Sequence, residues 1–203
     1  MPTCSNAWPG RAAKRARAVA AAASTGPTPQ TIPGCPHSSR SVAATIRMSV
    51  VAVSFERVDF DDPRARALAT ATVSELNSHY DGRPGSGAPP VAADFVPPDG
   101  AFVLALLDGD SIGCGGLCRF DEATAEIRRM YVAPHVRRRG ISRAILRELL
   151  EIGRELGYAR ARLETGHAQR EAIGLYETSG FRRIPCWGPY VADERSLCFE
   201  LDL

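Results

Sequence analysis

Short apolar runs alternate along the chain with longer segments in which apolar residues recur every three or four positions. The short runs predict β-strands, which cover residues 51–58, 101–107, 111–120, 125–132, 158–165, 181–184 and 197–201. The helical spacing predicts α-helices, which cover residues 63–76, 138–156 and 168–179. Pro63 fits a helix start, and Gly157 and Gly180 fit the ends of the later two helices.

The order of these elements predicts the topology of the sheet. Strands 101–107, 111–120 and 125–132 are joined by tight turns, so they should form an antiparallel meander. A helix and then strand 158–165 follow, and a crossover of this kind is right-handed with its two strands parallel. We therefore expect an α+β fold with a mixed, mostly antiparallel central sheet of about six to seven strands and helices on both faces.

Residues 1–47 differ in kind from the rest of the chain. They are rich in small residues, show no sustained periodicity, and hold six of the 25 basic residues but none of the 23 acidic ones. Such a segment buries too little apolar surface to offset its ordering entropy. We expect either a disordered Arg/Ala-rich tail with the composition of a transit peptide, or upstream sequence read in frame before a true start at Met48. Residues 48–203 then form one domain.

The charge of that domain excludes some partners. Residues 48–203 carry 19 basic against 23 acidic side chains, which is not the balance of a nucleic-acid-binding domain. No apolar run is long enough to cross a bilayer. We expect a monomer or homodimer in the cytoplasm that binds neither nucleic acid nor membrane.

The cysteines do not form a recognisable framework. They are Cys4, Cys35, Cys114, Cys118, Cys186 and Cys198. Cys114 and Cys118 have no second pair or histidine nearby that would complete a tetrahedral metal site. We expect buried free thiols in a reducing compartment, with no disulfide and no metal.

The segment from Met130 to Leu146, MYVAPHVRRRGISRAIL, carries the strongest chemical signal. A strand ends near Val132, Pro134 interrupts it, and three arginines and a glycine precede a long amphipathic helix. The unpaired N–H groups at a helix N-terminus bind anions, and arginines add charge-assisted hydrogen bonds. Because cations are unfavourable at that end of a helix without an anion, the pattern indicates a pyrophosphate site.

With these residues, the chain resembles the GNAT superfamily of acyl-CoA-dependent N-acetyltransferases. The motif [RQ]-x-x-G-x-[GA] of that superfamily matches residues 137–142, RRRGIS, where a serine takes the last position. Residues 171–181, EAIGLYETSGF, match the superfamily's A-x-x-L-Y-x-x-x-G-F segment. The resemblance covers residues 50–203 and implies a GNAT-like fold.

The resemblance implies acetyl-CoA as acyl donor and a set of residues that bind it. The pantetheine arm would pair with the main chain of the strand, and the diphosphate would lie at the following turn. The implied cofactor-binding residues are Met130, Tyr131, Val132, Arg137, Arg138, Arg139, Gly140, Ile141, Ser142 and Arg143.

Amine acetylation also needs an acid for the departing thiolate and a base for the ammonium. By resemblance, Tyr176 holds the position of the acid. Glu126, four residues before Met130 and expected on the same strand face, is the candidate general base. His167 is the alternative base, ahead of His79 and His135. Trp187, Tyr190 and Tyr80 are candidates for the walls of the acceptor pocket.

The sequence therefore predicts an N-acetyltransferase that moves an acetyl group directly from acetyl-CoA to a primary amine. A small-molecule acceptor is expected, because the chain has no additional substrate-recognition domain. A peptide or protein amine remains an alternative. A second alternative is a binding module that senses acyl-CoA without turnover, and a third is a nucleic-acid-associated protein that uses the basic tail.

Overall fold

The computed structural model describes residues 53–203 except residues 81, 83–84, 86 and 88. The tail expected at residues 1–47 lies outside this part. The strands are β1 (Ser54–Val58), β2 (Ala101–Leu107), β3 (Asp110–Arg119), β4 (Thr124–Val132), β5 (Arg160–Gly166), β6 (Arg182–Ile184) and β7 (Ser196–Asp202). The helices are α1 (Pro63–His79), α2 (Ile141–Glu155) and α3 (Arg170–Thr178), with 3₁₀ turns η1 (Ala92–Phe95), η2 (Pro134–Val136) and η3 (Gly188–Ala192).

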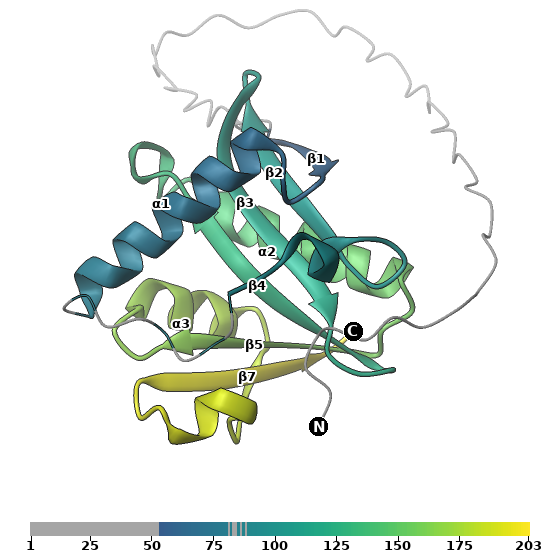
Figure 1. Ribbon diagram of the computed structural model, residues 1–203, viewed down its shortest axis with the longest axis vertical. Coiled ribbons are helices and arrows are strands. Elements are labelled where there is room, and N and C mark those ends of the chain that lie inside the picture. The colour runs from purple at the N-terminus through teal and green to yellow at the C-terminus, as the bar shows by residue number, and fades with distance from the viewer. Residues whose placement is uncertain (1–52, 81, 83–84, 86, 88) are drawn as a thin grey trace, which may run out of the picture. The chain divides into compact units, whose positions relative to one another are not determined.

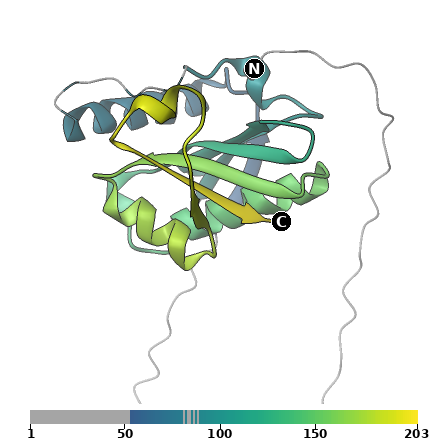
Figure 2. The same ribbon diagram turned by 90° about the horizontal axis from the view of Figure 1, so that it is seen from below.

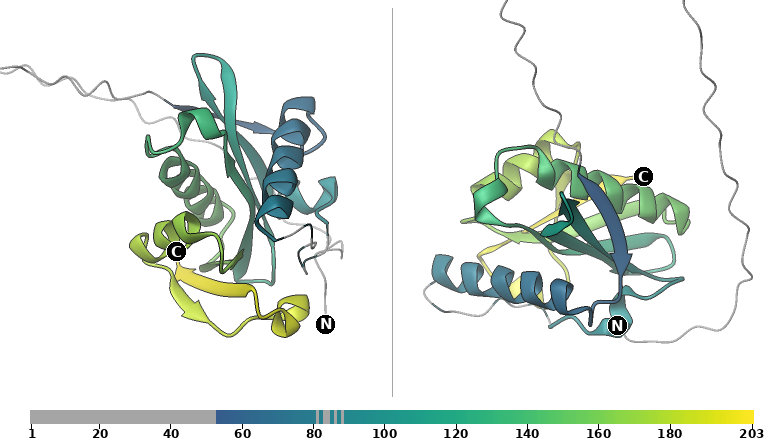
Figure 3. Two further views of the ribbon diagram at one scale, coloured as in Figure 1. Left: turned by 90° about the vertical axis from the view of Figure 1, so that its left-hand side faces the viewer. Right: turned by 90° about the horizontal axis from the view of Figure 1, so that it is seen from above.

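The strands form one seven-stranded sheet in the order β1-β2-β3-β4-β5-β7-β6. Only β4 and β5 pair in parallel, and all other neighbours are antiparallel. Helix α1 covers one face of the sheet, and α2 and α3 cover the other (Figures 1, 2 and 3). The α+β fold, the meander and the parallel crossover predicted from the sequence are confirmed.

Each face of the sheet has its own core. Towards α2, Ile145 and Leu149 are fully buried against the strands. Towards α1, the rings of Phe60, Phe95 and Phe102 pack together with centroids 5.1–5.3 Å apart. Burial of large apolar side chains on both faces fixes the register of the strands, because a slip of one residue would exchange the two faces.

Strands β4 and β5 diverge towards their carboxyl ends. Their pairing begins at Thr124 and Arg160 and stops at Ile127 and Leu163, although β4 continues to Val132. Figure 1 shows the two strands separating beyond this point. An opening between parallel strands leaves main-chain groups of β4 without a neighbour on that side.

A β-bulge in β4 overturns one expectation from the sequence. Gly116 pairs with Arg128 and Cys114 with Tyr131, so Gly115 faces two residues, Arg129 and Met130. Arg129 has a left-handed φ of 58°. An extra residue inverts the alternation of faces. Glu126 therefore shares the α1 face, whereas Met130 packs with the α2 core, and the two do not lie on one face as predicted.

The second helix begins three residues later than predicted. Arg138 and Gly140 have φ values of 61° and 79°, and Ile141 is the first helical residue. A left-handed backbone conformation is easy for glycine but unfavourable for arginine. Because both residues adopt it, the chain forms a turn here, and the helix starts after that turn. The expectation that Arg138 and Arg139 belong to the helix is wrong.

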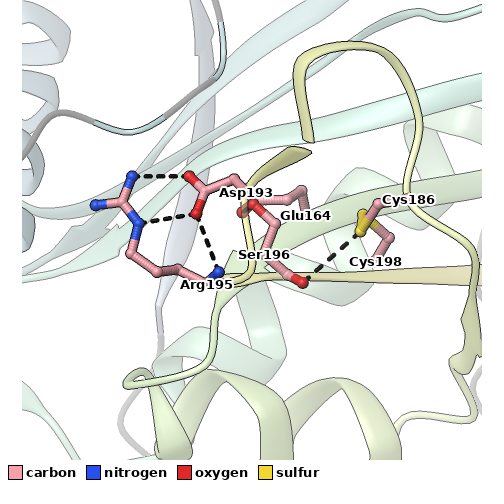
Figure 4. Close-up of a disulfide and its surroundings, with 6 residues drawn as sticks. All are labelled: Glu164, Cys186, Asp193, Arg195, Ser196 and Cys198. Atoms are coloured by element: carbon pink, nitrogen blue, oxygen red, sulfur yellow. Dashed lines mark hydrogen bonds and ion pairs between the residues drawn. A yellow bond between two sulfur atoms is a disulfide. The ribbon is translucent and has the colours of Figure 1, made fainter. Parts of the chain in front are cut away.

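The thiol prediction is also wrong for two of the cysteines. Cys186, in the loop after β6, and Cys198, on β7, form a disulfide (Figure 4) with their Cα atoms 5.2 Å apart. Cys114 and Cys118 are buried free thiols, as expected. Disulfides are typical of oxidising compartments, so the cytoplasmic location stays a prediction.

Replacing Cys186 with serine should lower the free energy of unfolding by about 2–3 kcal/mol, because the bond restricts the unfolded chain. Chemical denaturation of the variant measures this, and a thiol reductant should destabilise the wild-type protein equally. A non-reducing digest in which peptides containing Cys186 and Cys198 migrate separately would contradict the bond.

Candidate active site

A cleft of about 460 Å³ lies where β4 and β5 separate. Its walls come from α1, the segment before η1, β4, the end of β5, α3 and η3. Glu126, Met130 and Tyr176, which the sequence singled out, all line it. Glu164 and Tyr190 line it as well. Residues that are far apart in the sequence, from α1 to η3, therefore line one cleft.

The N-terminus of α2 presents the expected unpaired donors, but at shifted positions. The first intrahelical hydrogen bond runs from the Ala144 N–H to the Gly140 carbonyl at 3.1 Å. The N–H groups of Ile141, Ser142 and Arg143 therefore have no acceptor within the helix. The donor set is narrower than the predicted range, which began at Arg138. No acidic side chain lies in the first turn to compete for these groups.

The predicted arginines have different surroundings. The Arg137 guanidinium donates to the Val132 carbonyl at 2.9 Å and to Glu75 of α1 at 2.6 Å. Its pKa is raised first by this hydrogen bond to Glu75. Arg143 donates to the Thr178 hydroxyl at 2.8 Å and so ties α2 to the end of α3. Arg138 and Arg139 are exposed at the turn. Two of the four arginines thus also hold elements together.

Tyr176 is one of the buried residues that line the cleft. The residue is 7% exposed, and its ring packs against Phe181 and Phe199. The hydroxyl donates to the Met130 Sδ, which is 3.9 Å away. Burial, and then the charge of Glu164, raise the pKa of this phenol well above its ordinary value. The hydroxyl therefore keeps its proton at neutral pH and can donate it.

Glu126 is a buried carboxyl group with few partners. The residue is 6% exposed, and its Oε1 lies 3.7 Å from the Arg128 Nε. Burial raises the pKa of Glu126, and the charge of Arg128 opposes that shift. A carboxylate with a raised pKa is a better base near neutral pH.

Sequence reasoning missed Glu164 and Arg129. Glu164 accepts a hydrogen bond from the Ser196 hydroxyl at 2.6 Å (Figure 4), and burial raises the pKa of its carboxyl. The alternation of side chains along β5 placed Glu164 on one face of the sheet. It did not show that β4 would separate from β5 beside Glu164, so that this residue lines a cleft. Arg129, the bulged residue of β4, lines the cleft as well.

The aromatic candidates for the acceptor pocket separate into two groups. Tyr190 lines the cleft, and burial, then the charge of Glu126, raise its pKa to about 12. Trp187 instead packs on Phe120, with the Arg162 guanidinium 5.0 Å from its ring. The Tyr80 hydroxyl accepts from the Ala168 N–H at 3.3 Å. Trp187 and Tyr80 are not among the residues that line the cleft.

The histidine alternatives lie elsewhere. His167 is exposed, and its Nδ1 is 3.3 Å from the Arg195 carbonyl. His135 is exposed on η2, and the side chain of His79 lies outside the described residues. None of the three lines the cleft that the described residues form. The described residues also contain no cluster of three or more metal-ligating side chains, and none of their helices could span a membrane.

A sequence profile of the Acetyltransferase (GNAT) family matches residues 69–181. An IAA acetyltransferase from Azospirillum brasilense is 36% identical over 107 residues, which cover 52% of this chain and 70% of that protein. Two further curated relatives are matched over only 56% and 34% of their own length.

Solved structures share the fold. An acyl-CoA N-acyltransferase from Klebsiella pneumoniae superposes with a TM-score of 0.62 at 25% identity, over 75% of this chain and 99% of that one. A GNAT-family acetyltransferase from Elizabethkingia anophelis, solved with acetyl-CoA bound, has a TM-score of 0.54 at 19% identity. This superposition covers 74% of this chain and 98% of the Elizabethkingia protein. The similarity shows a shared fold.

Proposed function

The chain belongs to the GNAT family of acetyltransferases, and from that premise we propose that it transfers an acetyl group from acetyl-CoA to a primary amine of a small molecule. The observation that carries the proposal is the cleft in which Tyr176 and Glu126 lie beside the opening between β4 and β5. The reaction is an acyl transfer in one step from thioester to amine.

Acetyl-CoA fits the groups that this region offers. The unpaired N–H groups of Ile141, Ser142 and Arg143 suit a diphosphate. The main chain of Met130, Tyr131 and Val132 lies beyond the last β4–β5 pair, where an extended pantetheine arm could add as a strand. Gly140 and the exposed Arg138 and Arg139 belong to the same turn. Arg137 supports the binding of acetyl-CoA indirectly, because its hydrogen bond to the Val132 carbonyl fixes the end of β4.

The chemistry divides between two residues that line the cleft. Glu126 takes a proton from the acceptor ammonium, directly or through water, which produces the nucleophilic amine. The amine attacks the thioester carbonyl, and the C–S bond breaks. Tyr176 gives its proton to the departing thiolate, and the Tyr176 oxygen then takes the second proton that the acylated nitrogen must lose, which leaves a neutral amide and CoA thiol. Neither Cys114 nor Cys118 lines the cleft, so a covalent acyl-enzyme on either of these thiols is not part of the proposal.

The sensor alternative is separated by thiol release. The full chain should release CoA from acetyl-CoA when supplied with a panel of small amines. Tight acetyl-CoA binding with no release on any small amine, peptide or protein lysine would instead support a sensor. Release on peptides alone would assign the acceptor to the protein class. Monomer and homodimer both remain compatible with this proposal.

Replacing Ser142 with aspartate should weaken acetyl-CoA binding at least tenfold, about 1.4 kcal/mol. A carboxylate in the first turn of a helix stabilises the helix, but it repels a diphosphate at the same N–H groups. Calorimetry measures the affinity, and thermal denaturation should show unchanged or higher stability. Ser142→Asn is the neutral control of equal size. Equal affinities for the two variants would place the diphosphate elsewhere.

A further inference from the structure

Arg129 lines the cleft and has an unfavourable, left-handed backbone conformation. It is the extra residue of the β4 bulge, with a φ of 58°, and its charge acts on the Tyr190 phenol in the cleft. Its carbonyl accepts a hydrogen bond from the buried Cys114 thiol at 3.4 Å, which fixes the bulge from behind. A left-handed backbone conformation at an arginine is kept only where the surrounding structure imposes it.

The Arg129 guanidinium has no carboxylate partner among the described residues. The neighbouring Arg128 differs, because its guanidinium lies 3.7 Å from Glu126 and 3.8 Å from Asp94. Burial and the charge of Arg128 both lower the pKa of Arg129. A partly buried cation beside a like charge is unfavourable until an anion joins it.

The cleft also carries the opposite charge. Glu126 and Glu164 line it together with Arg129, and the charges of all three act on the Tyr190 phenol. Arg128 lines the cleft as well but is ion-paired, so among the described lining residues the carboxylates and the Arg129 guanidinium are complementary to a molecule that carries both signs. The carboxylates suit an ammonium, and a guanidinium presents the two parallel N–H groups that a carboxylate accepts.

We propose that the acceptor amine also bears a carboxylate, as an α-amino acid does, and that Arg129 binds this carboxylate while Glu126 faces the ammonium. The inference rests on the proposed acetyl transfer and narrows its acceptor class. A phosphate-bearing amine is disfavoured, because its phosphate carries about two negative charges and the same cleft also holds Glu126 and Glu164. Arg129 is then a specificity-determining residue of the acceptor site.

The test compares matched acceptors on the full chain. The probes are L-amino acids and the corresponding α-carboxamides, which keep the amine and side chain but lose the charge. With the wild-type protein, kcat/KM should favour the best carboxylate over its carboxamide at least tenfold. Arg129→Gln should abolish that preference, chiefly through KM of the carboxylate acceptor, and leave the affinity for acetyl-CoA unchanged.

Two further variants control for a loss of stability and for a general effect of removing an arginine. Arg129→Gly removes the side chain and relieves the left-handed φ, so it should lose the preference while its thermal stability holds or rises. Arg154→Gln removes an exposed arginine at the far end of α2 and should keep the wild-type preference.

The outcomes distinguish the inference from the proposed function. Acetylation of carboxamides and carboxylates with equal kcat/KM, or a preference that survives in Arg129→Gln, overturns the role of Arg129 and leaves acetyl transfer intact. Acetyl-CoA binding without acetylation of any amine overturns both.

Discussion

Replacing Tyr176 with phenylalanine should lower kcat by between ~10² and ~10⁴, the range typical of a positioned acid. The variant keeps the ring, its contacts with Phe181 and Phe199, and the shape of the cleft. It loses only the proton that the thiolate requires. Steady-state kinetics with the best acceptor measures the loss, and calorimetry should find the acetyl-CoA affinity unchanged.

The folded state should tolerate this change. The Tyr176 hydroxyl donates only to a methionine sulfur 3.9 Å away, so its removal should cost about 1 kcal/mol of stability or less. Tyr158→Phe is the matched control, because that buried hydroxyl donates to the Asp99 carbonyl at 2.8 Å outside the cleft. Tyr158→Phe should lower stability but not kcat. If both variants keep wild-type kcat, another group protonates the thiolate.

Replacing Glu126 with glutamine should lower kcat/KM by about 10²–10³, since glutamine has the same shape but accepts no proton near neutral pH. The pH profile gives the sharper result. Burial holds the pKa of Glu126 above its ordinary value of 4.5, and the base works only when ionised. Wild-type kcat/KM should therefore fall as the pH drops through that raised pKa, and the variant should lack this acid limb.

Glu164→Gln decides between the two carboxyl groups that line the cleft. Glu164 already accepts a hydrogen bond from Ser196, which makes it the weaker base, so its replacement should cost less than that of Glu126. Glu122→Gln, at an exposed position, should have no effect. An acid limb that persists in Glu126→Gln, with the larger loss in Glu164→Gln, would transfer the role of base to Glu164.

Predicted and observed elements agree to within about three residues at their ends, for a local reason. The helix predicted from residue 63 begins at Pro63, where the Asp62 carboxylate accepts from the Arg64 N–H at 2.8 Å. The strand predicted over 125–132 is observed as β4, Thr124–Val132. Periodicity and capping act within a few residues, so they can be read without knowing the fold.

The errors occurred where distant segments decide the outcome. The bulge at Arg129 depends on how β3 and β4 pair, and a strand pattern does not show an extra residue. The disulfide joins cysteines 12 residues apart, and only the return of β7 beside β6 brings them together. The predicted helix also extended back to Arg138, whereas the positive φ values of Arg138 and Gly140 make this segment a turn.

By itself the sequence determined the order of strands and helices, the presence of a helix after the arginine-rich segment, and the position of Tyr176 on α3. These features depend on residue spacing along the chain, which local backbone geometry converts directly into structure. Tertiary structure alone decided which charges meet: Arg137 pairs with Glu75, 62 residues away, and Arg129 shares a cleft with Glu126 and Glu164. Those meetings depend on where β4 and β5 part, because burial and charge act through space and not along the chain.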